Sequence, residues 1–400
     1  MKLGSIAALI RGFCIDLTGK PQTVVFQEWD GECPSNALKF KTDSEEAAAV
    51  VIRSAYETWK KSNPATGGGI PLPSCAALTD NGKTQAVFWI DNDIDSARAR
   101  LSEKDDSARI ETPAAANPVI GPAERADVVK NRIALVTGGA QGIGEEIVRN
   151  LACAGAFVFI ADLNLEGARR LADKINNDEK RTAAFALEVN VSSEESVEAM
   201  FDTIARTAGG LDLCISNAGV LKAGSVLEQE LSDFKFVTDI NYTGFFIISK
   251  YAGRLLRTQH FTAPCWTTDI IQVNSKSGLE GSNKNGAYAG GKFGGLGLVA
   301  SFAMELVEYG VKVNAVCPGN FLDGPLWSDP DRGLFVQYLR TGKVPGAKSI
   351  NDVRAFYEAK VPMKRGCTGK DLVRAIFYIV EQQYETGQAV PVTGGQIMLH

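Results

Sequence analysis

Short apolar runs alternate with amphipathic stretches along the C-terminal two thirds of the chain. Seven of these runs have the length and composition of buried strands. They are Ile133–Val136, Phe157–Ala161, Ala183–Leu187, Leu213–Ser216, Ile270–Asn274, Val311–Val316 and Ala389–Val392. The stretches between them repeat apolar residues at helical spacing, as Val197, Phe201 and Ile204 do. This alternation predicts an α/β fold, a doubly wound parallel sheet of about seven strands with helices on both faces.

Residues 1–111 show a weaker pattern. Thr23–Gln27 and Ala86–Ile90 have strand character. Thr42 and Glu45 have the spacing of a capping box, and apolar residues then recur on one helical face. These elements predict a small α+β N-terminal region, whose residues indicate no particular role.

A stretch rich in proline and alanine, residues 112–128, separates that region from the rest of the chain. It holds three prolines and no hydrophobic period, which is typical of an extended linker. The expected organisation is therefore the N-terminal region, this linker and one larger domain over 129–400.

Composition narrows the class of protein. Among 400 residues, 45% are hydrophobic and 22% are charged, and the net charge of −5 provides no electrostatic basis for binding nucleic acid or an anionic membrane. No apolar run approaches the roughly 20 residues that cross a bilayer. The eight cysteines form no CxxC pair and only two histidines are present, so we expect no metal site. These features favour a reduced, cytoplasmic protein.

A glycine-rich turn links the first predicted strand of the larger domain to its first helix. The turn contains Gly138, Gln141, Gly142, Ile143 and Gly144. Backbone N–H groups at such a helix N-terminus bind a pyrophosphate. Asp162 ends the next apolar run, where a carboxylate accepts hydrogen bonds from a ribose diol. An ordinary glycine turn is the simpler alternative, but the order strand, turn, helix, strand and acid is that of a Rossmann-type dinucleotide-binding unit.

Tyr288 and Lys292 are four residues apart in a predicted helix, which places the phenol and the ammonium on one face. A nearby cation favours phenolate, so we expect the pKa of Tyr288 to be lowered from about 10. Ser275 follows a predicted buried strand and carries a hydroxyl that can bind a substrate oxygen. The alternatives are a solvated surface pair for the first two residues and a turn cap for Ser275.

Together these motifs resemble the short-chain dehydrogenase/reductase family over essentially all of residues 130–400. The further matching positions are Asn217, Ala218, Gly219, Asn241, Pro318 and Gly319, and the resemblance also implies that Asn190 and Val191 bind the cofactor. The resemblance implies hydride transfer between a nicotinamide and a carbon that bears a hydroxyl or carbonyl group.

The resemblance also implies roles for a catalytic tetrad. Tyr288 exchanges the proton, Ser275 holds the substrate oxygen, and Lys292 also holds the nicotinamide ribose. Asn241 orders the water that relays protons to solvent. The alternative for Asn241 is a helix-interior amide bonded to backbone.

NAD is the cofactor that the sequence favours over NADP. The carboxylate of Asp162 repels a 2′-phosphate, and Leu163 and Asn164 supply no cation to offset it. Gln141 is uncharged where NADP-preferring relatives often carry a basic residue. Asn190 stands where relatives usually have an aspartate near the adenine, so the sequence departs from the family's pattern there.

Five strings resemble the sorbitol-6-phosphate 2-dehydrogenase group within that family. They are Gln272–Gly278, Lys292–Gly295, Gly319–Leu322, Lys360–Cys367 and Val392–Gln396. This resemblance implies interconversion of sorbitol 6-phosphate and fructose 6-phosphate, with Lys276 and Lys222 as candidate phosphate ligands or solvated surface charges. The alternatives are an unphosphorylated polyol or another small secondary alcohol, and a non-catalytic NAD-binding scaffold.

Two further features bear on substrate choice and assembly. The N-terminal region and a loop over His260–Thr268 have no counterpart in the simplest members, and either could redirect substrate choice. The helix of Tyr288 also contains five interior glycines, each of which costs a helix roughly 0.5–1 kcal/mol relative to alanine. They are Gly290, Gly291, Gly294, Gly295 and Gly297. Such glycines persist most easily where another backbone packs closely, so we expect a homodimer or homotetramer.

Overall fold

The computed structural model describes residues 2–42, 44–65, 69–111, 127–331, 333–340, 342 and 344–398. Its main body is a seven-stranded parallel sheet in the order β13-β12-β11-β10-β7-β8-β9. The strands are β7 (Ile133–Thr137), β8 (Phe157–Asp162), β9 (Ala184–Glu188), β10 (Leu213–Ser216), β11 (Thr268–Val273), β12 (Val311–Pro318) and β13 (Ala389–Val392). The predicted doubly wound fold is confirmed, and each predicted strand is present with its ends shifted by about two residues or less.

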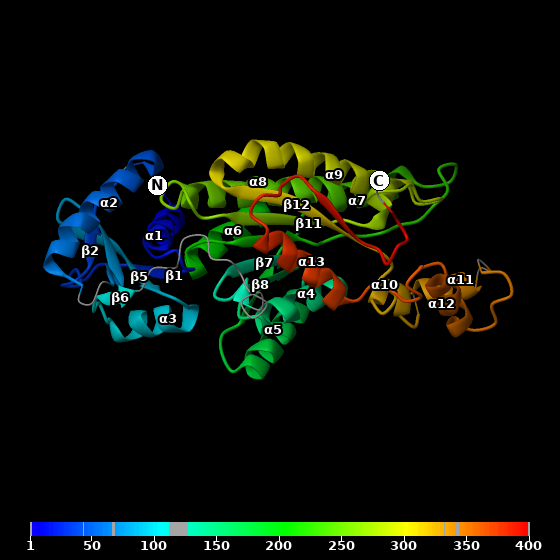
Figure 1. Ribbon diagram of the computed structural model, residues 1–400, viewed down its shortest axis with the longest axis horizontal. Coiled ribbons are helices and arrows are strands. Elements are labelled where there is room, and N and C mark those ends of the chain that lie inside the picture. Colours follow the sequence, from blue (N-terminus) through cyan, green and yellow to red (C-terminus); the bar gives the residue numbers. More distant parts are fainter. Residues whose placement is uncertain are drawn as a thin grey trace.

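Helices cover both faces of this sheet, as Figure 1 shows. One face carries α4 (Gly142–Cys153), α5 (Leu165–Glu179) and α13 (Gly369–Glu381). The other carries α6 (Glu194–Ala208), α8 (Gly244–His260) and α9 (Gly286–Leu306). Ile133 and Leu135 of β7 pack on the second face, whereas Ala134 and Val136 pack on the first. Because alternate strand residues point to opposite faces, an unbroken apolar run supplies both cores.

The contacts of α9, the helix of Tyr288, give a different reason for two of its glycines than the expected approach of another backbone. A Cβ on Gly294 would lie 2.8 Å from the ring of Tyr242, and one on Gly295 would lie 2.5 Å from the amide of Gln272. Side chains of the same chain therefore require these two glycines. Gly290 and Gly297 have nothing within 4 Å, so their Cα atoms lie on an open surface of α9.

The N-terminal region consists of helices and strands around a four-stranded mixed sheet in the order β1-β5-β4-β2. Its elements are α1 (Leu3–Thr18), β1 (Thr23–Glu28), β2 (Leu38–Phe40), α2 (Glu45–Ser62), β3 (Ile70–Leu72), β4 (Cys75–Asp80), β5 (Lys83–Asp91), α3 (Ile94–Glu103) and β6 (Arg109–Glu111). The cap expected at Thr42 is wrong, because the hydroxyl of Ser44 accepts the hydrogen bond from the N–H of Ala47. Most of the expected linker, residues 112–126, lies outside the described residues.

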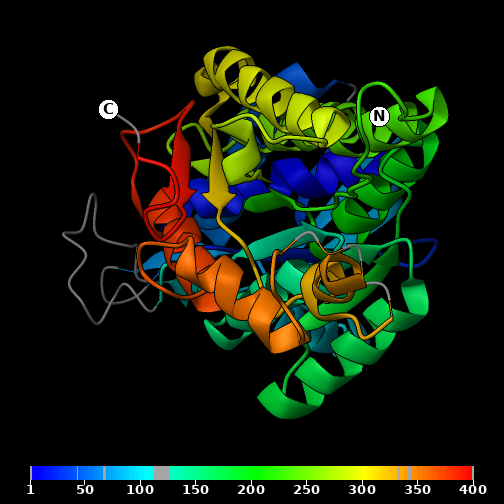
Figure 2. The same cartoon turned by 90° about the vertical axis from the view of Figure 1, so that its right-hand side faces the viewer.

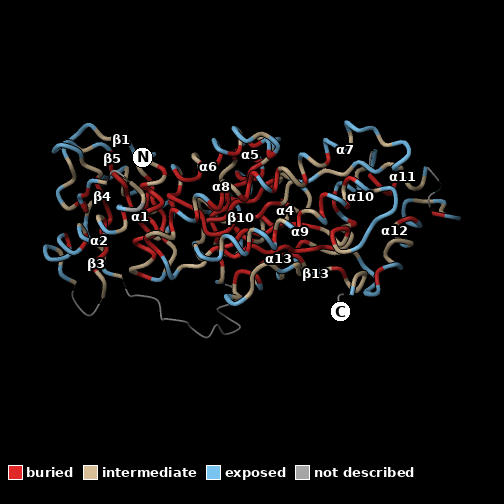
Figure 3. Tube along the Cα trace, turned by 90° about the horizontal axis from the view of Figure 1, so that it is seen from above, coloured by how far each residue is buried: buried red, intermediate tan, exposed pale blue. Residues whose placement is uncertain are grey.

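Helix α1 joins the N-terminal region to the larger domain. It packs against α6 and α8, near the ends of strands that lie opposite the glycine turn (Figure 1). A Cβ on Gly12 would lie 2.4 Å from the carbonyl oxygen of Gln259, so the two backbones touch. Figure 3 shows that buried segments continue from the sheet into this region. The two parts therefore share one packed interior.

The loop over His260–Thr268 belongs to this junction. The hydroxyl of Thr262 donates to the carbonyl of Leu9 at 2.8 Å, and the indole N–H of Trp266 donates to Asp212 at 3.0 Å. The loop thus contacts α1 and the base of the sheet, and its effect on substrate choice stays a prediction.

A separate group of helices follows β12 and precedes α13. It comprises α10 (Pro325–Ser328), α11 (Leu334–Arg340) and α12 (Ile350–Ala359), seen in front in Figure 2. These helices enclose a small apolar core around Trp327, Phe335 and Val353. Among the described residues, no helix is both long and apolar enough to cross a membrane.

Candidate active site

The glycine turn at the end of β7 forms a tight cradle. Gly138 and Gly142 have φ of +61° and +59°, which disfavours any side chain. A Cβ on Gly144 would lie 2.0 Å from the carbonyl oxygen of Gly138. The side chain of Gln141 does not cap α4, so the first N–H groups of the helix have no side-chain acceptor. This arrangement fits the pyrophosphate of a dinucleotide.

The segment that follows β10 stabilises the glycine turn through hydrogen bonds and close packing. The amide of Asn217 donates to the carbonyls of Thr137 and Gly138 at 2.9 and 3.0 Å. A Cβ on Gly138 would lie 2.9 Å from the Cα of Ala218. The Asn-Ala-Gly segment therefore holds the backbone of the turn in place, with Gly219 extending toward the catalytic residues.

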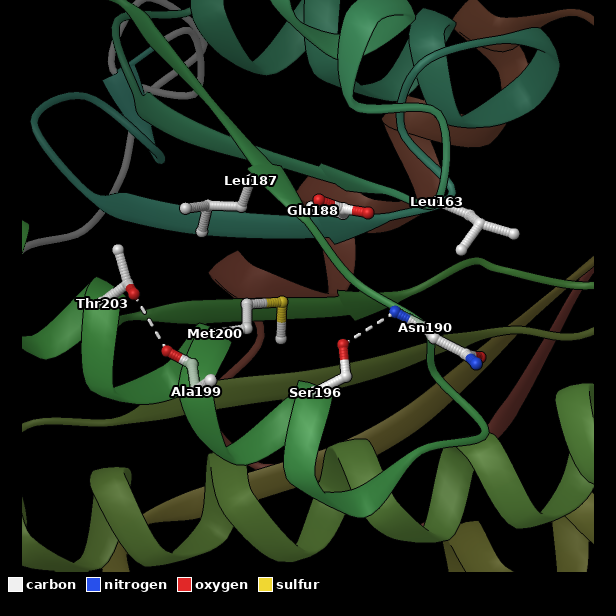
Figure 4. Close-up of a pocket in the computed structure, with 8 residues that line it drawn as sticks. All are labelled: Leu163, Leu187, Glu188, Asn190, Ser196, Ala199, Met200 and Thr203. Carbon is white, nitrogen blue, oxygen red and sulfur yellow. Dashed lines mark hydrogen bonds between the residues drawn. The ribbon is translucent and has the colours of Figure 1, made fainter.

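Asp162 is the last residue of β8, and Asn190 and Val191 follow β9. Asp162 accepts hydrogen bonds from the N–H groups of Ala140 at 3.0 Å and Asn164 at 2.9 Å, so its carboxylate is fixed beside the turn. Nearby, a pocket of about 300 Å³ is lined by residues of these strand ends and of α6 (Figure 4). Its lining includes Asn190, the position expected near an adenine, and Leu163, which follows Asp162.

Lys292 lies in the buried interior between α9 and β11. Its ammonium donates to the carbonyl of Val273 at 2.8 Å and lies 5.6 Å from the ring centroid of Tyr288. The alternative of a solvated surface pair is therefore wrong, because Lys292 is only 5% exposed. The spacing of four residues brings the two groups together as expected.

Burial dominates the proton affinities of this pair. It raises the pKa of Tyr288, with the hydroxyl of Ser275 acting in the opposite direction and Cys317 adding to the rise. Burial also lowers the pKa of Lys292 to about 8. The expected lowering of the Tyr288 pKa is therefore wrong for the protein alone, because desolvation of the phenolate outweighs the effect of its neighbours.

Asn241 lies in a π-helical turn, Asp239–Thr243, before α8. Its amide donates to the carbonyl of Val220 at 2.9 Å and accepts from the N–H of the same residue at 2.8 Å. A Cβ on Gly219 would lie 3.4 Å from the Asn241 Oδ1 atom and 3.8 Å from the Lys292 ammonium. Asn241 is thus bonded to backbone, as the alternative proposed, and it also lies near Lys292.

Ser275 begins a short 3₁₀ turn, Lys276–Gly278, at the end of β11. Its hydroxyl accepts a hydrogen bond from the N–H of Ser277 at 3.1 Å, so it caps this turn and also interacts with Tyr288. Gly319 follows Pro318 at the end of β12, and its N–H donates to the carbonyl of Val392 at 3.0 Å. The carboxyl ends of β7, β10, β11 and β12 thus bring the expected residues to one edge of the sheet.

The two candidate phosphate ligands differ in their surroundings. The ammonium of Lys222 forms an ion pair with Asp233 at 2.5 Å and lies over the ring of Phe236. Lys276 is half-buried, and within the described parts of the chain it forms no ion pair. Burial lowers the pKa of Lys276, Glu280 opposes this effect, and the positive charge of Lys360 adds to it. Lys276 is therefore the cation that remains available.

Three residues of the site were not identified from the sequence. Gln272 and Asn274 are buried polar residues at the end of β11, within a run that sequence periodicity treated as a plain strand. Cys317 is buried beside the site, and burial raises its pKa to about 12. Nothing in the spacing of residues along the chain marks Cys317 as part of the site. Gln272 and Asn274 could have been noticed, because they are polar amides on either side of Val273 in an otherwise apolar strand.

A doubly wound sheet with a glycine-rich cradle and a Ser–Tyr–Lys group around a buried lysine at the same edge is typical of an oxidoreductase that acts on CH–OH groups. A family model described as short chain dehydrogenase matches residues 132–328. The chain belongs to this short-chain dehydrogenase family, whose members use a nicotinamide dinucleotide.

Individual relatives agree with the family. The chain is 34% identical over 271 residues to a sorbitol-6-phosphate 2-dehydrogenase of Escherichia coli, covering 67% of this chain and 99% of that one. It is 29% identical over 255 residues to a meso-2,3-butanediol dehydrogenase of Serratia marcescens, covering 60% and 96%. The crystal structure of a sorbitol-6-phosphate 2-dehydrogenase from Erwinia amylovora matches with a TM-score of 0.61 and 36% identity, covering 66% of this chain and all of that one.

Proposed function

We propose that the protein is an NAD-dependent dehydrogenase that interconverts sorbitol 6-phosphate and fructose 6-phosphate. The observation that carries this proposal is the similarity, at 34% and 36% identity over nearly the whole relative, to two proteins with that activity in their names. The second candidate is oxidation of an unphosphorylated diol or polyol, which the similarity to a butanediol dehydrogenase favours.

The residues at the sheet edge support a proton-transfer role for Tyr288. When bound, the nicotinamide would accept or donate the hydride at the reacting carbon. Tyr288 would take the hydroxyl proton during oxidation and return it during reduction, while the hydroxyl of Ser275 would hold the same oxygen. The ammonium of Lys292 would stabilise the phenolate and bind the nicotinamide ribose, and Asn241 would order a water that reaches Lys292.

The charge at the end of β8 supports NAD. Asp162 has its carboxylate fixed by two backbone N–H groups, and its free acceptor positions suit a ribose diol. A 2′-phosphate at the same place would meet a fixed negative charge. The cradle residues expected from the sequence, from Gly138 to Gly144 and from Asn217 to Gly219, would hold the pyrophosphate and the nicotinamide side.

Lys276 is the residue proposed to select a phosphorylated substrate. It adjoins Ser275, it lacks an ion-pair partner among the described residues, and the charge of Lys360 adds to the positive potential there. A phosphate placed between such cations gains charge-assisted hydrogen bonds. Lys222 is a weaker candidate because Asp233 already neutralises it.

The test is NADH production across a panel of free and phosphorylated polyols, measured under matched conditions. Sorbitol 6-phosphate is expected to give the highest kcat/KM, with sorbitol at least about tenfold lower, and Lys276→Met is expected to erase most of that difference. Equal rates on sorbitol and sorbitol 6-phosphate would reject the phosphate assignment. Tyr288→Phe serves as the control for catalysis, and full activity in this variant would reject the proposed mechanism.

We also propose that residues 1–111 form a structural part of the enzyme. The support is the packing of α1 against α6 and α8 and the buried contact between Arg11 and Asp212. Expression of residues 127–400 alone is expected to yield insoluble or unfolded protein, since α1 would leave apolar surface and a buried carboxylate uncovered. A soluble fragment with unchanged activity would instead indicate a docking or targeting role for the N-terminal region.

The open surface of α9 supports a homodimer or homotetramer. Gly290, Phe293, Gly297 and Met304 lie along one exposed stripe of this helix, and Phe246 of α8 is also exposed beside it. An apolar stripe with small residues allows two helices to approach closely. A monomer measured by light scattering would contradict this proposal.

A further inference from the structure

The side chain of Asn274 connects the two elements that carry the catalytic residues. Its Oδ1 atom accepts a hydrogen bond from the N–H of Ser275 at 2.8 Å. Its Nδ2 atom donates to the carbonyl of Lys292 at 2.9 Å. One amide thus bonds the backbone of both Ser275, on the loop after β11, and Lys292, on α9.

The neighbouring side chain of Gln272 orients this amide. Its Oε1 atom accepts the second hydrogen of Asn274 Nδ2 at 2.7 Å. Both residues are buried, with exposed fractions of 2% and 3%. Buried amides that are hydrogen-bonded to one another hold a fixed geometry, because a rotated Asn274 amide would lose its bonds to Ser275 and Lys292.

Two glycines make room for these amides. A Cβ on Gly278 would lie 2.1 Å from Asn274 Oδ1, and a Cβ on Gly295 would lie 2.5 Å from Gln272 Nε2. The turn of Ser275 and the helix of Lys292 therefore each carry a glycine where an amide approaches the backbone. The two amides and the two glycines thus pack closely together at the interface between β11 and α9.

We propose that Asn274 is a positioning residue of the reaction: its amide sets the separation between the Ser275 hydroxyl and the Tyr288–Lys292 pair. This inference rests on the proposed function, in which Ser275 and Tyr288 bind the same substrate oxygen although they lie on different elements. A displacement of about 1 Å between groups of this kind reduces the rate by about 100-fold. The ammonium of Lys292, bonded to the carbonyl of Val273, adds a second connection between the same two elements.

The proposal predicts a change that loss of stability alone would not produce. The groups that face Tyr288 are Ser275 from the loop, Lys292 from its own helix and Cys317 from β12. Ser275 lowers the pKa of Tyr288, so releasing Ser275 raises the pKa of the phenol further. Activity that depends on the phenolate then shifts to higher pH.

The experiment compares Asn274→Ala with Asn314→Ala in the full-length protein. Asn314 is a matched control because it is also a buried asparagine, 1% exposed, whose side chain accepts from the N–H of Gln388 and donates to the carbonyl of Glu385. The measurements are kcat and KM against pH for an alcohol that the wild-type protein oxidises, and the ultraviolet difference spectrum of tyrosinate without substrate. Neither measurement depends on which alcohol is the natural substrate.

Asn274→Ala is expected to lower kcat by about 10- to 100-fold with a smaller change in KM, and to shift the tyrosinate titration to higher pH. Asn314→Ala is expected to lower the melting temperature but to leave the pH profile unchanged. Equal effects of the two variants on kcat and on the pH profile would overturn the proposal.

A second pair of variants covers the case in which Asn274→Ala does not fold. Gly278→Ala crowds the Asn274 amide, whereas Gly281→Ala places its methyl group where nothing lies within 4 Å. Gly278→Ala is expected to reproduce the loss of kcat and the shift to higher pH, and Gly281→Ala to behave as wild type. An unchanged pH profile in Gly278→Ala would contradict the role of Asn274.

Discussion

The guanidinium of Arg11 and the carboxylate of Asp212 lie 2.6 Å apart, and both side chains are completely buried, although 201 positions separate them. Asp212 also accepts the N–H of Ile133 at 2.8 Å and the indole N–H of Trp266 at 3.0 Å. Burial acts to raise the pKa of Asp212, but Arg11 and Arg132 together hold it below its ordinary value. The N-terminal helix thus supplies the counter-ion for a carboxylate inside the larger domain.

Removing the cation of this pair is expected to destabilise the protein strongly. Arg11→Met leaves the charge of Asp212 buried without its partner, which costs about 3–5 kcal/mol in the free energy of unfolding. Arg53→Met is the control, because Arg53 pairs with Asp16 at the surface of the same region, where such pairs contribute about 1 kcal/mol or less. Urea unfolding measures both variants. A loss in Arg11→Met no larger than that in Arg53→Met would contradict a stabilising role for the pair.

The lowered pKa of Lys292 predicts a pH dependence of stability. The folded protein releases the Lys292 proton near pH 8, whereas the unfolded chain keeps it to about pH 10.5. Between these values the unfolded state binds more protons, so the contribution of Lys292 to the free energy of unfolding increases with pH. The wild type is therefore expected to gain stability relative to Lys292→Met from pH 8 to pH 10. A difference between the two proteins that does not change over this range would show that Lys292 is not desolvated.

The fixed carboxylate at the end of β8 predicts cofactor preference. Asp162→Asn keeps an acceptor for one backbone N–H and removes the negative charge, so the ratio of kcat/KM with NAD to that with NADP is expected to fall by about 10- to 100-fold. Asp173→Asn, at an exposed position of α5, is the control and should leave the ratio unchanged. Initial rates with each cofactor provide the ratio. Wild-type preference for NADP would refute the assignment directly.

The apolar stripe on α9 predicts the effect of a charge there. Met304 is 80% exposed in a single chain, and Met304→Asp is expected to shift the protein from dimer or tetramer toward monomer. Val50→Asp, at a residue of α2 that is 73% exposed, should leave the assembly unchanged. Light scattering coupled to size exclusion measures the mass of each variant. An unchanged mass for Met304→Asp would place the interface elsewhere.

The local pattern of the chain was enough to predict most of the larger domain. Strands such as Phe157–Asp162 were found because parallel strands buried on both faces are continuous apolar runs. Tyr288 and Lys292 meet because helical geometry converts a spacing of four residues into a contact. The glycine turn could also be located from local sequence, because the strand before it and the helix after it adjoin it along the chain.

Other features had no reliable local signal. Helix α1 was missed because its residues are buried on all sides, so no amphipathic period marks it, and Arg11 interrupts the apolar run. Burial of Tyr288 itself reversed the expected shift in its pKa, because the cost of desolvation depends on every element packed around the phenol.

The sequence by itself determined the class of fold, the glycine turn and the contact between Tyr288 and Lys292, because each depends on residues within one strand, turn or helix. Only the tertiary structure decided that Arg11 neutralises Asp212, that Asn274 joins Ser275 to Lys292, and that Lys222 pairs with Asp233. These relationships depend on how distant elements pack. A buried charge or amide is satisfied by whichever partner the packing brings near, and spacing along the chain does not encode that choice.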